Sequence, residues 1–173
     1  VDIVVEAPGF ISGNLLKSEN GFEVAPVILS EGTARFSIGP SVGATIIGMD
    51  PSFLEIGYLE TIDGRRITGP PERNSLYLNH KLSEEMGVIK GDNVLIDIST
   101  RSREDNVLLS RDGGSSLKLN MTVSDILKDS GLGRYREDSV GRVKPIAFIS
   151  LDRLQERADL HGQVNRFLVN NQD

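Results

Sequence analysis

The hydrophobic and polar positions of residues 76–98 change their period twice. Residues 76–78 form a short apolar run typical of a buried strand, and Leu82 and Met86 then stand four residues apart, as on one face of a helix. Apolar and polar residues alternate from 94 to 98, which is the pattern of a strand with one buried face. This segment therefore predicts a strand, a short helix and a second strand.

Four residues mark the boundaries of these elements. Asn79 stands where its side-chain oxygen can accept a hydrogen bond from the unpaired N–H groups at the start of the helix. Gly87 fits the left-handed conformation that ends a helix, where a side chain would clash. Gly91 and Asp92 predict a turn into the second strand. All four have structural roles, and none supplies an obvious reactive group.

The same order of elements returns near the end of the chain. Residues 146–149 predict a strand, and Ser150 is a suitable N-cap. The amphipathic helix that follows carries Gln155 and is expected to end at Gly162. Residues 164–169 alternate as a last strand. The chain thus contains two predicted β-α-β units.

The remaining predicted elements are mostly strands bounded by Gly, Pro or Asn. They are expected at residues 2–7, 23–30, 33–38, 44–48, 107–109 and 117–127, with a hairpin at Glu31-Gly32 and a short helix after Ser12. Residues 53–62 have no clean period, so their state stays open. Together these patterns predict an α+β fold with mixed or antiparallel sheets.

Two stretches are expected to be connections. Residues 63–74 hold two Gly, two Pro and three Arg and form the best internal boundary. Residues 128–142 are long for a bare connection, at about 15 residues, and carry mixed charge. Arg134, Tyr135 and Arg136 are therefore candidates for a partner surface. Arginines gather in both stretches, at positions 65, 66, 73, 134, 136 and 142, where a solvated loop, an anion site and a protein contact all stay open.

Composition narrows the classes of partner and site. The 173 residues are 38% hydrophobic and 5% aromatic with no Trp, so the core must consist mainly of Val, Ile and Leu, which favours sheet. The net charge of −6 argues against a nucleic-acid partner, because phosphate binding needs clustered cations. The absence of Cys excludes disulfides and thiolate sites.

The sequence shows neither a membrane-spanning run nor a signal segment. No apolar run approaches the roughly 18 residues that a span needs, and the chain does not open on a charged and then apolar segment. The first residue is Val and not Met. We therefore expect the chain to be a soluble piece of a longer protein.

The candidate catalytic groups do not form a known motif. His80 and His161 are the two histidines, and neither has a second His or Cys at ligand spacing, so surface or capping roles are expected. The adjacent acidic pairs diverge on a helix or strand. The glycines near residue 131 lack the context of a dinucleotide site, and no G-x-S-x-G elbow occurs. The sequence predicts no enzyme, cofactor or metal site.

Three segments in order resemble a known family. They are IIGMDP at 46–51, SLYLNHKLSEEMGVIKGDNVLIDIS at 75–99 and AFISLDRLQE at 147–156. These segments are similar to those of the extracytoplasmic core domains of ABC transporter permeases of the MacB/FtsX-like superfamily. The resemblance covers most of residues 44–169, and it departs from the family at Ser124-Asp125, where the family pattern has a small Gly.

The resemblance implies a single, two-lobed and non-catalytic ectodomain over residues 1–173. Residues 1–62 and 144–173 would form a membrane-proximal lobe that brings the termini together, and residues 63–143 would form an outer lobe. The domain would lie on the extracytoplasmic side of the cell membrane. The permease would be a homodimer or heterodimer that works with a cytoplasmic ABC ATPase, and the domain would contact a substrate or partner protein and couple transmembrane motion to the outside.

Two other classes of function stay open. The Gly-Val-x-x-Gly-Asp-x-Val pattern at 87–94 also occurs in double-psi barrels, which bind substrates or DNA, and a closed six-stranded barrel in the central region would favour this interpretation. An enzyme with an unrecognised site would need a deep pocket that joins His80 or His161 to two carboxylates.

Overall fold

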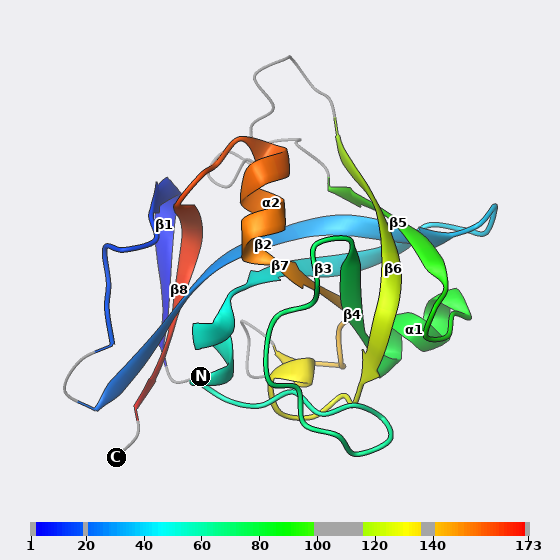
Figure 1. Ribbon diagram of the computed structural model, residues 1–173, viewed down its shortest axis with the longest axis horizontal. Coiled ribbons are helices and arrows are strands. Elements are labelled where there is room, and N and C mark those ends of the chain that lie inside the picture. The colour runs from blue at the N-terminus through cyan, green and yellow to red at the C-terminus, as the bar shows by residue number, and fades with distance from the viewer. Residues whose placement is uncertain (1–2, 19–20, 99–115, 136–140, 172–173) are drawn as a thin grey trace.

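The computed structural model describes residues 3–18, 21–98, 116–135 and 141–171, which form a mostly β structure with two short α-helices (Figure 1). The strands are β1 (Ile3–Ser12), β2 (Phe22–Phe36), β3 (Val42–Met49), β4 (Ser75–Asn79), β5 (Asn93–Ile98), β6 (Leu117–Leu127), β7 (Ile146–Ser150) and β8 (Gln163–Asn171). The helices are α1 (His80–Met86) and α2 (Leu151–Ala158), and the 3-10 turns are η1 (Pro51–Leu54) and η2 (Gly131–Arg134).

Six of these strands close into a barrel. The order around the barrel is β2-β3-β7-β4-β6-β5, and pairing of β5 with β2 completes the ring. β3 runs parallel to β7 and β4 runs parallel to β6, whereas the other barrel pairs are antiparallel. Closure leaves these six strands without a free edge. The expected mixed sheet is confirmed, in the form of a closed barrel.

Strand β2 joins the barrel to a second layer. Residues 22–27 pair with β8, and β8 pairs with β1 on its other side. Residues 28–34 of β2 pair with β3, and residues 32–36 also pair with β5. One strand of 15 residues therefore stands where the sequence predicted two strands and a hairpin.

Gly32 explains why the predicted hairpin is wrong. It lies where β2 is flanked by both β3 and β5. A Cβ atom at this position would stand 2.7 Å from the carbonyl oxygen of Asp97 and 3.3 Å from Cγ1 of Ile46. Glycine therefore allows two backbones to approach closely inside a strand. The sequence alone does not show whether a Glu-Gly pair permits a close approach of two strands or a turn between them.

The core consists of two clusters on opposite faces of the barrel wall. Ile46 and Leu78 belong to the first cluster, and their neighbours Ile47 and Tyr77 belong to the second. Because successive strand residues point to opposite faces, the first cluster fills the barrel and continues to α2 and β8, whereas the second lies on the outer face, beneath residues 53–67 and η2. Burial on both faces accounts for the continuous apolar runs of β3, β4 and β7.

The two helices occupy equivalent places in the barrel topology. α1 follows β4 and α2 follows β7, and these two strands are antiparallel neighbours. Exchanging β2 with β5, β3 with β6 and β4 with β7 leaves the order of the strands around the barrel unchanged. The two strand-helix units found in the sequence therefore belong to two equivalent halves of one barrel.

Several predicted boundaries shift in the structure. β1 continues through Pro8-Gly9 to Ser12, and residues 13–16 form a turn and bends instead of the expected helix. α2 ends at Ala158, and its C-cap Asp159 takes the left-handed conformation at φ 56°, three residues before the predicted stop at Gly162. Asp tolerates this conformation better than most residues. The strand expected at 107–109 lies outside the described residues.

The barrel takes strands from both of the expected lobes. β2 and β3 belong to the first part of the expected membrane-proximal lobe, β4 to β6 to the outer lobe and β7 to the second part of the proximal lobe. The described residues therefore do not show a two-lobed shape, because the pairs that close the barrel cross that boundary. The two ends of the described chain do lie together, since Ile3 pairs with Val169 and Phe22 pairs with Asn171 (Figure 1).

Candidate functional site

A groove of about 860 Å³ lies on the outside of the barrel. One wall is the connection from Arg65 to Asn74, and the other is formed by Tyr77 of β4, residues 122–125 of β6, and Lys90 and Gly91. Its volume falls within the range of about 300–1,000 Å³ that is usual for small-ligand sites. It is therefore a candidate site.

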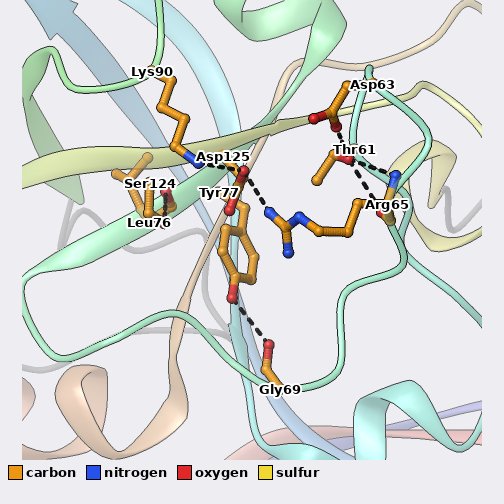
Figure 2. Close-up of polar contacts among 9 residues, drawn as sticks. All are labelled: Thr61, Asp63, Arg65, Gly69, Leu76, Tyr77, Lys90, Ser124 and Asp125. Carbon is orange, nitrogen blue, oxygen red and sulfur yellow. Dashed lines mark hydrogen bonds and ion pairs between the residues drawn. The ribbon is translucent and has the colours of Figure 1, made fainter.

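Asp125 stands at the centre of the charged part of this groove (Figure 2). Its Oδ1 atom lies 2.7 Å from Nη2 of Arg65 and 3.0 Å from Nζ of Lys90. The side chain of Asp125 is 16% exposed, whereas those of Arg65 and Lys90 are 54% and 66% exposed. The hydrogen bond from Arg65 to Asp125 raises the pKa of the guanidinium above its ordinary value. One carboxylate thus receives two cations from two different segments.

A β-bulge places Asp125 in the groove. Leu119, Met121 and Val123 alternate into the barrel, and a regular strand would send residue 125 inward as well. The register with β4 shifts between Val123 and Asp125, and the hydroxyl of the intervening Ser124 donates to the carbonyl of Leu76 at 3.0 Å. The bulge therefore turns the carboxylate out of the apolar interior.

Hydrogen bonds hold the connection from Arg65 to Asn74, which forms the first wall of the groove (Figure 2). The phenol of Tyr77 donates to the carbonyl of Gly69 at 3.1 Å, and burial raises the pKa of this phenol. The hydroxyl of Thr61 accepts from the N–H of Arg65 at 2.9 Å. The same hydroxyl donates to Asp63, and this hydrogen bond lowers the pKa of the Asp63 carboxyl. These contacts fix the backbone that carries Arg65.

Gly91 and Asp92 form the turn that carries Lys90. Gly91 has φ 96°, a conformation that favours glycine, and its N–H donates to the carbonyl of Val123 at 2.8 Å. Val123 donates in turn to the carbonyl of Asp92 at 2.8 Å, and the Asp92 carboxylate accepts from the N–H of Ile89 at 2.9 Å. The turn is thereby tied to β6 directly beside Asp125.

Asn79 is fully buried and joins three segments. Its Oδ1 accepts from the N–H groups of Leu82, at 3.1 Å, and Ile146, at 2.9 Å. Its Nδ2 donates to the carbonyls of Gly133, at 3.2 Å, and Lys144, at 2.8 Å. Asn79 is therefore the expected helix cap, and it also connects α1 to η2 and to the start of β7.

The other structural residues from the sequence have simpler contacts. Gly87 ends α1 with φ 67°, in the left-handed conformation. Ser150 holds the N-cap position of α2, but its side chain makes no capping hydrogen bond. Gln155 is buried and donates from Nε2 to the carbonyl of Gln163 at 2.8 Å, which ties α2 to β8.

The structure describes two of the three residues proposed as a partner surface, and one of these two is buried, so the surface stays a prediction. Tyr135 is 7% exposed and belongs to the outer core cluster, so its ring is unavailable to a partner. Arg134 is exposed at the end of η2, and Arg136 lies outside the described residues. Sequence spacing alone did not show that the tyrosine packs under the loop.

The histidines lie apart from the groove. Nδ1 of His80 is 3.8 Å from Oδ2 of Asp129, and Nε2 of His161 is 3.9 Å from Oδ1 of Asp159. Each is exposed, and neither lines the groove. Among the described residues, no group of three or more His, Asp or Glu side chains is arranged to hold a metal ion.

Three polar residues of structural importance were missed in the sequence. Lys90 and Asp125 meet only because the bulge and the turn bring them together. Asn165 is buried on β8, and its side chain bonds both the N–H and the carbonyl of Leu29 where β2 leaves β8. The sequence feature that could have indicated the exposed position of Asp125 is the polar pair Ser124-Asp125, which interrupts the alternation of apolar and polar residues in this strand.

Three solved structures share this fold. The extracellular domain of the ABC-type transporter YknZ from Gram-positive bacteria matches with a TM-score of 0.54 and 11% identity, over 87% of this chain and 65% of that chain. The periplasmic region of MacB from Actinobacillus actinomycetemcomitans matches with a TM-score of 0.50 and 10% identity, over 87% of this chain and 57% of that chain. A domain from Porphyromonas gingivalis, described as part of a permease protein, matches with a TM-score of 0.55 and 13% identity, over 93% of this chain and 68% of that chain.

These matches confirm the resemblance to permease ectodomains at the level of the fold. The chain spans less than two thirds of the YknZ and MacB domains. No protein-family model and no curated protein matches the sequence. Neither helix in the described part of the chain is long and apolar enough to cross a membrane.

Proposed function

We propose that this chain is an extracytoplasmic domain of an ABC transporter permease, which contacts a substrate or a partner protein and couples ATP-driven transmembrane motion to the outside. The observation that carries the proposal is the fold shared with the extracellular domain of YknZ and the periplasmic region of MacB over 87% of this chain. The order of the three sequence segments at 46–51, 75–99 and 147–156 supports the same assignment.

The position of the two chain ends supports attachment to a membrane at one side. Ile3 and Val169 are register partners, and the start of β2 lies beside the end of β8. Membrane segments joined to both ends would therefore leave on the same side. The turn after Phe36 lies at the other end of the long strand β2 and would point away from the bilayer (Figure 1).

In this proposal the domain binds and transmits, and performs no catalysis. A cytoplasmic ATPase subunit would act on it through membrane segments outside the chain, within a permease homodimer or heterodimer. The groove beside Asp125 is formed by structural turns and exposed cations, which suit binding better than proton transfer.

Cysteine labelling of the membrane-embedded protein tests both parts of the proposal. The chain has no Cys, so Ile38→Cys in a Cys-free full-length background introduces a single thiol at a side chain that is 99% exposed. A membrane-impermeant maleimide is expected to label it in intact cells. Ala147→Cys is the matched control, because Ala147 is fully buried and is expected to react only after denaturation.

Coupling is tested with a second thiol near the chain ends. Ile3→Cys, at a side chain that is half exposed, is expected to change its labelling rate when the ATPase is replaced by a variant that binds but does not hydrolyse ATP. Labelling of Ile38→Cys only after cell lysis would contradict the location. Equal rates for Ile3→Cys with both ATPases would contradict coupling at this end of the domain.

A binding module of the double-psi-barrel type is the second candidate function. The closed six-stranded barrel and the Gly91-Asp92 turn favour it, although the barrel strands extend over residues 22–150 and not over the central region alone. This candidate predicts ligand binding without any membrane-linked partner. Loss of Ile38→Cys labelling in intact cells, together with a soluble full-length protein, would favour it over the transporter domain.

A further inference from the structure

The groove beside Asp125 gathers three cations. Arg65, Arg73 and Lys90 line it, whereas Glu72 and Asp125 are its carboxylates. Arg73 is also paired with Glu156, which does not line the groove, so the charges at its walls balance. The groove therefore lacks the negative charge of the chain as a whole, whose net charge is −6, and its exposed cations can accept an anionic ligand.

The two cations that contact Asp125 can also bind a second anion. They share a single oxygen atom of Asp125, and the contact from Arg65 uses its Nη2 atom. A guanidinium carries five N–H donors in a planar fork that fits a carboxylate in bidentate fashion. Both cationic side chains are more than half exposed, so an entering anion can reach them from solvent.

The shape of the groove favours an organic anion over a small ion. A volume of about 860 Å³ is far larger than a single oxyanion needs. Pro70, Ile67 and Tyr77 contribute apolar atoms to its walls beside the charged groups. The connection that carries Ile67 and Pro70 is fixed by the hydrogen bond from Tyr77 to Gly69, so the site exists before a ligand arrives.

We propose that this groove binds an organic carboxylate, such as the carboxyl end of a peptide, through Arg65 and Lys90. Asp125 holds both cations in place when no ligand is bound and competes with the ligand for them. The proposal does not depend on the transporter role, because binding can be measured on the 173-residue chain alone.

A titration followed by nuclear magnetic resonance tests this site. The probe is acetyl-Ala-Ala-Ala with a free carboxyl end, added to the isotopically labelled chain up to about 10 mM, a range that covers weak binding. Saturable shifts of the amide signals of Lys90, Gly91 and Ser124 are expected. The same peptide with an amidated end is expected to give no saturable shift, and inorganic phosphate separates a general oxyanion site from a carboxylate site.

Substitutions assign the interaction to the proposed groups. Arg65→Gln and Lys90→Gln are each expected to weaken binding about tenfold, the usual scale for a lost charge-assisted hydrogen bond. Asp125→Asn is expected to tighten binding, because the competing charge is gone. Arg35→Gln is the matched control, since Arg35 is an exposed arginine of β2 that does not line this groove.

Each other outcome overturns part or all of the proposal. The absence of saturable shifts, or equal binding by the amidated peptide or by both glutamine variants, overturns the site. Binding of phosphate without a response to the peptide overturns the organic ligand. Unchanged or weaker binding by Asp125→Asn overturns competition. Dispersed amide spectra of all variants are required first, which separates lost binding from lost folding.

Discussion

At the scale of single residues, the buried polar groups determine how segments meet. Asn79 uses both atoms of its amide, so one side chain satisfies two backbone N–H groups and two carbonyls. Asn165 does the same for one residue of β2. A buried polar group costs free energy unless its partners are present, so these amides favour one arrangement of the chain over others.

Replacing Asn79 is expected to destabilise the protein strongly. Asn79→Ala removes the side-chain partner of four backbone groups, three of them in buried hydrogen bonds, and we expect the free energy of unfolding to fall by about 3 kcal/mol. Asn79→Asp keeps the acceptor but places a carboxylate against two carbonyls, so it is expected to destabilise as well. Urea unfolding measures both changes.

The control for this prediction is an exposed asparagine. Asn120→Ala, on the outer face of β6, is expected to change the free energy of unfolding by less than about 0.5 kcal/mol. If Asn79→Ala changes the free energy of unfolding as little as Asn120→Ala does, the proposed role of the Asn79 amide in joining segments is wrong.

At the scale of elements, two strands make the barrel possible. β2 is long enough to pair with β8 at one end and with β3 and β5 at the other. β6 carries the bulge that keeps its inner face apolar and places Asp125 in the groove. Gly32 lies at the position on β2 where pairing with β5 begins, so barrel closure depends on the space that it leaves.

Adding a methyl group at Gly32 is expected to disturb barrel closure. The new Cβ of Gly32→Ala would stand 2.7 Å from a backbone oxygen of β5, which cannot move without shifting the strand. We expect a loss of about 1–3 kcal/mol in the free energy of unfolding, the usual range for overpacking. Thermal and urea unfolding measure the loss.

Gly43→Ala is the matched control on the neighbouring strand. Gly43 pairs with Thr33 of β2, and a Cβ there would meet no atom within 4 Å. Its substitution is expected to be nearly neutral. Equal effects of the two substitutions would show that strand glycines are alike and that close approach at Gly32 is unimportant.

At the scale of the whole molecule, the first and last described strands, β1 and β8, lie side by side. The barrel and the β1-β8 layer share β2, so neither can unfold without exposing a face of the other. The equivalence of the two halves of the barrel places α1 and α2 after neighbouring strands. Any motion passed in at the ends would reach the barrel through β8 and β2.

Unfolding is therefore expected to be a single cooperative transition. Calorimetry should give a calorimetric enthalpy equal to the van't Hoff enthalpy, as for other two-state domains of this size. Separate transitions, with one assigned to residues 63–143, would instead support two independent lobes. The measurement decides between a shared barrel and the two-lobed arrangement that the sequence suggested.

The sequence by itself determined the local units. The period at residues 76–98 and 146–169 and the cap and stop signals of the first helix act over a few residues, and the strands, helices and Asn79 cap found there follow from them, whereas α2 ends before the predicted stop at Gly162. The order of these units was also enough to indicate the permease ectodomain fold that the solved structures share.

Only the tertiary structure decided how the units join and where the groove forms. Barrel closure pairs β2 with β5 across some 60 residues of sequence, a contact that local pattern does not encode. The same holds for the close approach at Gly32, the burial of Tyr135 and the meeting of Arg65 and Lys90 at Asp125. Each depends on strands packed from distant segments, because a side chain's neighbours in space are set by strand register.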